Sequence, residues 1–291
     1  MTTAHSLREK ASASIDYRGR NLIGKNFDGM DLSNLDFSEA DLTGCSFEGA
    51  DLTGANFTKA KLRDANLYSA ILDRTNLTDA DMRYADFTGA DCEQTKFNGA
   101  RLAESKFTAA HFYKADFNGA DAFEASFKRS FIINTDMTAM NLRRANFTSA
   151  TMSDTDLSGS NIVKAVFERS FLQDMDFEGR DLEDVTFKSA NLSGASFKNT
   201  NLKNATFTSA NMDSAQMQKC TISQATFHNA WMKNTNLAGA DMEGARMMNA
   251  RLVRANLIDA NIDDTDFSGG DVKSVSLRKG MIADFKGAKR R

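Results

Sequence analysis

Apolar residues, nearly all of them large, recur at every fifth position of this chain, without a slip, from Leu22 to Ile282. Two positions before most of them stands a small residue, most often Ala, and the residue between is usually polar, commonly Asp or Asn. This inward, outward, inward order is the period-two alternation of a short strand. The two residues that complete each unit are polar or Gly, which is typical of turns. A helix is excluded because a five-residue period would carry apolar side chains around its whole circumference.

The large apolar residues fall into four columns when they are sorted at intervals of twenty residues. The column that begins at Phe27 is mostly Phe, whereas the column that begins at Leu22 contains no Phe. Similar side chains therefore recur every four units, which predicts a square coil of twenty residues whose backbone pairs with the coils above and below. A chain of this length provides about 13 such coils.

The unit Ala-Asp/Asn-Leu/Phe followed by two turn residues resembles the repeat of the pentapeptide repeat family, and the resemblance covers residues 20–284. It implies an all-β fold, a right-handed quadrilateral β-helix. It also implies protein binding without catalysis, because the best understood members bind type II DNA topoisomerases by imitating DNA, and some protect DNA gyrase from quinolones. Other members are secreted bacterial effectors.

The first functional hypothesis follows from this resemblance: a DNA-mimicking protein that interacts with DNA gyrase or another type II topoisomerase. The relatives that confer quinolone resistance carry loops that interrupt the rod, and this chain has none. That difference favours simple occupation of the DNA-binding saddle of the topoisomerase over active protection of a poisoned enzyme.

We expect three segments: an N-terminal cap (1–19), the β-helix (20–284) and a basic C-terminal tail (285–291). Ser6-Leu7-Arg8-Glu9 matches a capping box, which predicts a short helix covering the first coil. The apolar residues of the other end either fold onto the last coil or meet a second subunit. By resemblance, a homodimer through the C-terminal end is a hypothesis for these residues: Val272, Leu277, Met281, Ile282 and Phe285.

Composition agrees with a β-helix that stays in the cytoplasm. The chain has no Pro, which suits strands that all donate ladder hydrogen bonds. Mean hydropathy is −0.44, and no apolar run reaches membrane-spanning length. The first residues contain no apolar signal core, so we expect a cytoplasmic protein with no membrane partner. The net charge is −3 and the basic tail is short, which argues against direct nucleic-acid binding.

No motif indicates an enzyme, a metal site or a cofactor. The three histidines (His5, His111 and His228) are far apart in the coil order, and no Cys-x-x-Cys occurs. The three cysteines (Cys45, Cys92 and Cys220) take inward positions and are interpreted as reduced, apolar fillers. A narrow, filled core leaves no room for a small-molecule substrate.

One outward position carries apolar residues where the repeat uses Asp or Asn. Spacing in multiples of twenty places these residues on one side of the coil: Ile71, His111, Phe131, Phe171 and Trp231. Tyr113 and Ile133 point outward from the same side, and Arg129 and Arg169 flank it. Aligned exposed apolar residues are typical of contact surfaces, although isolated ones are ordinary. The second hypothesis is therefore an interaction scaffold or bacterial effector that binds other proteins through this stripe, unrelated to topoisomerases.

A row of carboxylates occupies another side, one per coil: Asp116, Asp136, Asp156 and Asp176. Each can hydrogen-bond its own turn, or the row can imitate the phosphates of DNA. The first hypothesis needs this row. Basic residues on a further side count against a wholly DNA-like surface: Arg63, Arg83, Arg143 and Arg144.

Some inward positions within the repeat break the pattern. Met140, Met175 and Arg180 stand where small residues are expected, and Ala122 stands where Leu is expected. Burying an unpaired guanidinium costs several kcal/mol. We therefore expect Arg180 to turn outward or to pair with Asp181 or Asp184, with a local bulge or kink near residues 170–185.

Overall fold

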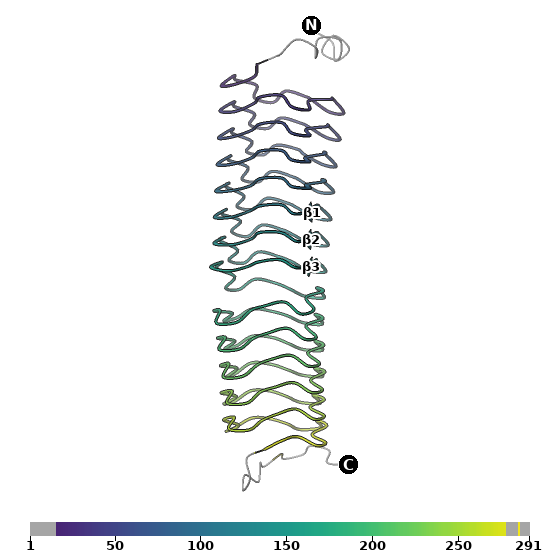
Figure 1. Ribbon diagram of the computed structural model, residues 1–291, viewed down its shortest axis with the longest axis vertical. Coiled ribbons are helices and arrows are strands. Elements are labelled where there is room, and N and C mark those ends of the chain that lie inside the picture. The colour runs from purple at the N-terminus through teal and green to yellow at the C-terminus, as the bar shows by residue number, and fades with distance from the viewer. Residues whose placement is uncertain (1–15, 278–284, 286–291) are drawn as a thin grey trace. The chain divides into compact units, whose positions relative to one another are not determined.

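The computed structural model describes residues 16–277 and residue 285, and these form a parallel β-helix with four five-residue sides per coil (Figure 1). Residues twenty positions apart are bridged in parallel on all four sides, as in Asn21–Asp41, Asn26–Ser46, Asp31–Asp51 and Asp36–Asn56. The predicted square coil of twenty residues is therefore confirmed. The predicted capping helix, Met281 and Ile282 lie outside the described residues, which contain no helix.

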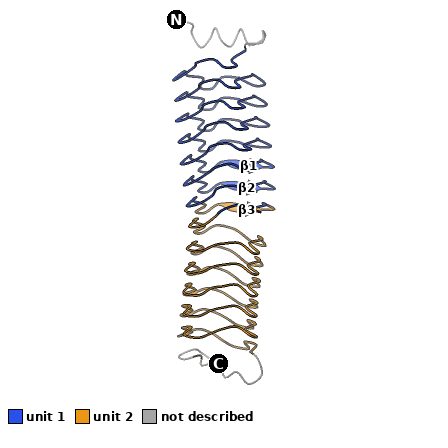
Figure 2. Ribbon diagram, turned by 90° about the vertical axis from the view of Figure 1, so that its left-hand side faces the viewer, with its two compact units in different colours: residues 1–146, 155–161 blue, residues 147–154, 162–291 orange. Residues whose placement is uncertain are grey.

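The described residues divide into two compact units with the same coil architecture (Figure 2). The first unit runs to Asn146 and includes Thr155–Asn161, and the second comprises Phe147–Asp154 and the chain from Ile162 onward. The first unit contains β1 (His111–Tyr113) and β2 (Phe131–Ile133), which pair in parallel. The second contains β3 (Thr151–Ser153).

Each side is held by backbone hydrogen bonds to the coils before and after it. Leu22 N–H donates to the Asp41 carbonyl at 2.8 Å, and Asp41 N–H donates to the Arg20 carbonyl at 2.9 Å. At the corner, Ala40 N–H donates to the Phe37 carbonyl at 3.1 Å. Glu39, inside this turn, has a φ of 60°, as the third residue of a type II turn requires. The equivalent position has a positive φ in nearly every described unit, which explains why it is so often Gly or Asn.

The polar residue that precedes each large apolar residue also shapes the corner. The Asp41 carboxylate accepts hydrogen bonds from the Thr43 backbone N–H at 3.3 Å and from the Thr43 hydroxyl at 2.7 Å. Asn56 does the same for Thr58. Because a short oxygen-bearing side chain makes this bond best, the repeat prefers Asp or Asn here.

The core consists of the large and small inward residues, which are almost all fully buried. Phe rings of one column stack from coil to coil, as Phe27 does on Phe47 with ring centroids 5.0 Å apart. The opposite Phe column stacks in the same way, as Phe37 does on Phe57 at 4.8 Å, and Tyr17 extends it at 4.7 Å from Phe37. The two Phe-rich columns therefore face each other across the coil, and the columns between them are mostly Leu and other non-aromatic residues. Such ring pairs add about 0.5–1.5 kcal/mol each beyond the area they bury.

Ala122 stands where Leu is expected because a large residue, Phe112, occupies the opposing side of the coil. Phe112 is the one aromatic residue of a column that otherwise holds Leu and other non-aromatic residues, and its ring touches those of Phe107 and Phe117, with centroids 5.5 and 5.1 Å away. Ala122 lies ten residues further on, which places it on the opposing side of the coil. Both residues are buried. The small side chain of Ala122 therefore compensates for the additional volume of Phe112.

The other irregular inward residues leave the backbone register unchanged. Met140 and Met175 are buried, and Arg180 is half-buried. Parallel bridges twenty residues long continue through this stretch, from Phe171 to Asn191, from Asp176 to Ser196 and from Asp181 to Asn201. Toward the following coil, these bridges show no bulge near residues 170–185, and the Arg180 side chain is only partly exposed.

Candidate functional site

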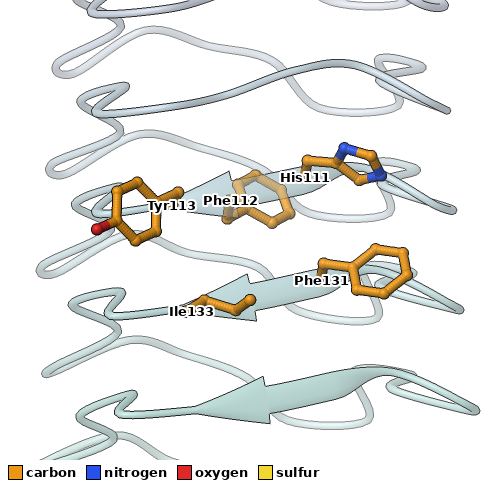
Figure 3. A pocket seen from close by; sticks show the side chains of 5 residues that line it. All are labelled: His111, Phe112, Tyr113, Phe131 and Ile133. Carbon is orange, nitrogen blue, oxygen red and sulfur yellow. The ribbon is translucent and has the colours of Figure 1, made fainter.

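A hollow of about 260 Å³ opens on the outer face of β1 and β2 in the first unit. Its lining is apolar and aromatic, and consists of His111, Phe112, Tyr113, Phe131 and Ile133. Figure 3 shows His111 above Phe131 at one end of the two strands and Tyr113 above Ile133 at the other. Register explains this arrangement, because His111 pairs with Phe131 and Tyr113 pairs with Ile133.

The hollow forms where the repeat lacks its usual Asp or Asn. His111 and Phe131 have no short side-chain oxygen to accept the backbone N–H two residues further on, so this support of the regular corner is missing. The chain remains extended through Tyr113 and Ile133, as β1 and β2. The missing oxygen does not decide the corner alone, because Ile71 also lacks it but keeps the regular corner, whereas β3 is extended although Thr151 carries a hydroxyl. Together the two coils place four outward side chains around one depression.

Packing holds the walls of the hollow in place. The His111 and Phe131 rings meet edge to face, with centroids 5.1 Å apart and planes at 86°. Lys114 Nζ lies 5.0 Å from the centroid of the Tyr113 ring, within cation–π range. Even so, Phe131 is 46% exposed and Tyr113 is 41% exposed. Preformed, exposed aromatic surface of this kind is suited to receiving an apolar side chain of another protein.

The remaining residues of the predicted stripe do not join this hollow. Ile71 is exposed in the first unit, but Asp91 stands between it and His111 in the ladder. In the second unit, Phe171 is bridged to Thr151 and Asn191, whereas Trp231 carries Arg251 over its ring at 4.6 Å. The structure thus gathers His111, Tyr113 and Phe131, while Phe171 and Trp231 are separate features of the second unit.

The two predicted flanking arginines sit at turn corners outside the lining of the hollow. Arg129 and Arg169 have φ values of 58° and 57°. Arg169 Nε approaches the Glu168 carboxylate at 3.8 Å. Phe112, which forms part of the lining, was missed by sequence reasoning because its position marks it as a core residue.

The carboxylate row is real within the first unit, where Asp116 is bridged to Asp136 and Asp136 to Asp156. Asp176 belongs to the second unit and is bridged to Ser196. Each of the four accepts a backbone N–H from two residues further on, at 2.7–3.0 Å. These carboxylates therefore perform the same local task as the other Asp residues of the repeat.

A second acidic group, which the sequence analysis did not single out, lies on the same side as the hollow. Asp91 is bridged to His111, and Asp73 and Glu93 stand in the column of Tyr113, forty and twenty residues before it. Among the described residues, none of these three carboxylates has an ion-pair partner within 4 Å. Asp73 Oδ1 is buried, and no described residue donates a hydrogen bond to it. Burial, followed by the charge of Asp91, raises the pKa of Asp73 above its ordinary value.

The three cysteines are free, buried thiols. Burial raises the pKa of Cys45, raises the pKa of Cys92 far above its ordinary value, and raises the pKa of Cys220 to about 12. All three thiols therefore stay protonated at physiological pH, which agrees with their interpretation as apolar fillers.

Other kinds of site find no support in the described ranges. No group of three His, Cys, Asp or Glu side chains there is placed to hold a metal ion. In the same residues, no helix has the length and apolar character needed to cross a membrane.

Part of the apolar C-terminal end is covered by the chain itself. Phe285 is buried, and its ring meets Phe267 edge to face with centroids 4.9 Å apart. Val272 is also buried, whereas Leu277 is half-buried. Of the two alternatives for this end, folding back therefore accounts for Phe285 and Val272.

These features define a class of protein: a repeat solenoid built from five-residue sides. The chain belongs to the pentapeptide repeat family, whose fold is the right-handed β-helix. A family model described as a pentapeptide repeat region matches residues 40–110 and 180–257, about half of the chain. A second, described as pentapeptide repeats (8 copies), matches residues 18–49, 125–162 and 160–199. Residues 111–124, which include β1 and Ala122, lie outside all of these ranges.

Solved structures with a similar fold include three pentapeptide repeat proteins. HetL, involved in heterocyst differentiation regulation in the cyanobacterium Nostoc sp. strain PCC 7120, is 22% identical; the match covers 97% of this chain and 100% of HetL, with a TM-score of 0.36. Rfr23 from the cyanobacterium Cyanothece 51142 is 18% identical over 42% of this chain and 88% of its own, with a TM-score of 0.32. QnrB1, a plasmid-mediated fluoroquinolone resistance protein, is 15% identical over 89% of this chain and 90% of its own, with a TM-score of 0.30. No curated protein matches the sequence.

Proposed function

We propose that this protein is a non-enzymatic, cytoplasmic binding protein that docks a partner protein at the hollow on β1 and β2. The observation that carries the proposal is the hollow itself: two consecutive coils replace the usual Asp or Asn by His111 and Phe131 and expose a preformed aromatic surface. Exposed aromatic residues that cluster around a depression are typical anchoring points of protein interfaces. The rest of the stripe offers single apolar residues, which are ordinary on protein surfaces.

Photo-crosslinking tests this function in a lysate of the native host. A photoreactive phenylalanine analogue replaces Tyr113, and in a matched control it replaces Tyr68, an equally exposed tyrosine outside the hollow. We expect crosslinks to a discrete partner from position 113 and not from position 68. Excess unlabelled wild-type protein should compete them away, whereas excess Phe131→Asn protein should not. Equal competition by the two proteins would contradict docking at the hollow.

Binding to a type II topoisomerase through the carboxylate row is the second candidate. The observation in its favour is the stacking of Asp116, Asp136 and Asp156 in successive coils of the first unit. A DNA gyrase supercoiling titration, with and without a quinolone, separates the two candidates. The second candidate requires inhibition or rescue at micromolar protein that Asp136→Lys with Asp156→Lys removes and Phe131→Asn leaves intact. No effect up to tens of micromolar would exclude it.

A homodimer through the C-terminal end is a further part of the proposal. Leu277 is the half-buried apolar residue that a second subunit would cover. Light scattering that shows a strict monomer at micromolar concentration would remove the dimer.

A further inference from the structure

The face that carries the hollow continues into the acidic group formed by Asp73, Asp91 and Glu93. The ladder places Asp91 directly before His111, so carboxylates and aromatic rings follow one another along the same side of the first unit. Asp91 and His111 are direct neighbours, because residues twenty positions apart are bridged in successive coils. The apolar hollow and the acidic group therefore form a continuous surface.

The acidic group lacks the cations that its charges require. Some carboxylates of the first unit have such a partner one coil away, as Asp41 has in Lys61 at 3.3 Å and Asp86 in Lys106 at 3.4 Å. Asp73, Asp91 and Glu93 have no ion-pair partner among the described residues, although Arg74 offsets part of the charge around Asp73. Three carboxylates at close range repel one another, and a cation brought by another molecule would reduce that repulsion.

We propose that the hollow and the acidic group form one composite site for an extended segment of a partner protein. This segment carries an aromatic or aliphatic side chain for the hollow and a Lys or Arg for the carboxylates. The inference rests on the proposed function and names the chemistry of the partner that the hollow receives. Charge complementarity favours this occupant over an uncharged or acidic one.

The geometry of the ladder sets the spacing of the two anchors. Coils of a β-helix are about 4.8 Å apart, so the middle of the hollow lies about 7 Å from the level of Asp91 and Glu93, and about 12 Å from Asp73. An extended chain advances about 3.3 Å per residue. The basic residue should therefore follow or precede the apolar one by about two to four positions.

Selection of peptides from a random 12-residue phage library on the full chain tests the composite site, with synthetic versions of the enriched peptides as probes. Binding is then measured by fluorescence anisotropy to three variants. Phe131→Asn removes the apolar wall without a charge and restores the usual residue of the repeat. Asp91→Asn with Glu93→Gln removes two charges next to the hollow. Glu243→Gln with Asp263→Asn, in the second unit, is the control that removes two charges elsewhere.

We expect enriched peptides with an apolar residue and a Lys or Arg at the stated spacing. Phe131→Asn should abolish their binding, and Asp91→Asn with Glu93→Gln should weaken it about three- to tenfold at low salt, as expected for exposed ion pairs. The control should bind as the wild type does. Circular dichroism melting curves establish that each variant is folded.

Two outcomes would overturn the composite site in different ways. Peptides that depend on Phe131, but contain no basic residue or bind the Asp91→Asn, Glu93→Gln variant equally well, overturn the composite site and leave the proposed function standing. A selection that yields no peptide sensitive to Phe131→Asn contradicts the proposed function as well. Self-association of the wild type in sedimentation runs, abolished by Phe131→Asn, would make the occupant a second copy of this chain and likewise overturn the proposal.

Discussion

Single residues at the turn corners adopt a backbone conformation that most side chains avoid. Ala109 has a φ of 55°, and a left-handed conformation costs a residue with a Cβ about 1–2 kcal/mol. We predict that Ala109→Gly stabilises the protein by up to about 1 kcal/mol, because this relief exceeds the entropy that Gly loses on folding. Ala103→Gly is the control, since Ala103 stands in a neighbouring turn without a positive φ, and it should destabilise by about 0.5–1 kcal/mol. Urea unfolding of both variants measures the two effects, and equal signs would contradict the argument.

The carboxyl group of Asp73 makes stability depend on pH. Burial, and then Asp91, raise its pKa above the ordinary value of 3.8. Because the pKa is raised in the folded state, the contribution of this carboxyl group to folding stability is fully present below pH 3.8. That contribution is lost as the pH rises through the pKa of the folded protein. We therefore predict that Asp73→Asn raises the melting temperature near neutral pH, and that this gain disappears below the ordinary pKa.

Asp266→Asn provides the control of opposite sign for Asp73. The Ser268 backbone N–H, then its hydroxyl, lowers the pKa of Asp266, so the contribution of this carboxylate is present above the ordinary pKa and is lost as the pH falls through the lowered value. Asp266→Asn should lower the melting temperature at neutral pH. If Asp73→Asn instead lowered the melting temperature at neutral pH, the prediction would be contradicted, because the Asp73 carboxylate would then stabilise the folded protein.

At the scale of one coil, Phe112 and Ala122 should act as a pair. Ala122→Leu alone should destabilise by about 1–3 kcal/mol, because it adds volume to a filled core. Phe112→Leu alone leaves unfilled space and should cost a similar amount. Together they should cost less than the sum of the single changes, and urea unfolding in a double-mutant cycle measures the difference. As a control, Ala122→Leu with Phe197→Leu should be additive, since Phe197 lies in the second unit; additivity of the first pair would contradict volume compensation.

The coil could be predicted from the sequence because the same inward positions recur in every unit. In a coil with four five-residue sides, residues twenty positions apart lie above one another. The Phe column that begins at Phe27 therefore predicted the parallel pairing at intervals of twenty residues, which the bridges show. The hollow could be predicted only in part. Column position placed His111 and Phe131 on one side, but nothing in it indicated that Phe112 would line the depression.

The acidic group was missed for a related reason. Asp73 and Glu93 stand in turn positions, where charged residues are ordinary, and only the ladder shows that they are neighbours of Asp91. No bulge occurs near Arg180 toward the following coil, because pairing at twenty-residue intervals holds the backbone register of Asp176 and Asp181 on either side of it. Departures from a repeat can be located from sequence, but how neighbouring coils absorb them depends on packing.

At the scale of the whole chain, the stabilising contacts join residues of the same coil or the next one. Backbone hydrogen bonds run between residues about one coil apart, as from Leu22 to Asp41, and ring stacking has the same range. In such a solenoid, stability is a sum of coil and neighbour terms, and opening can begin locally instead of everywhere at once. Coils near an end have fewer neighbours to hold them.

The three native cysteines can report this local opening. Because burial raises the pKa of each thiol, labelling requires exposure, and the unopened protein should be almost unreactive. Cys45 lies only about one coil after Leu22, whose carbonyl its thiol approaches at 3.0 Å, whereas Cys92 lies deeper in the first unit. We predict that iodoacetamide labels Cys45 well before Cys92, as followed by peptide mass spectrometry. Labelling in denaturant corrects for intrinsic reactivity. If both thiols, and Cys220 in the second unit, reacted at one common rate, opening would be global and the chain would unfold as a single cooperative block.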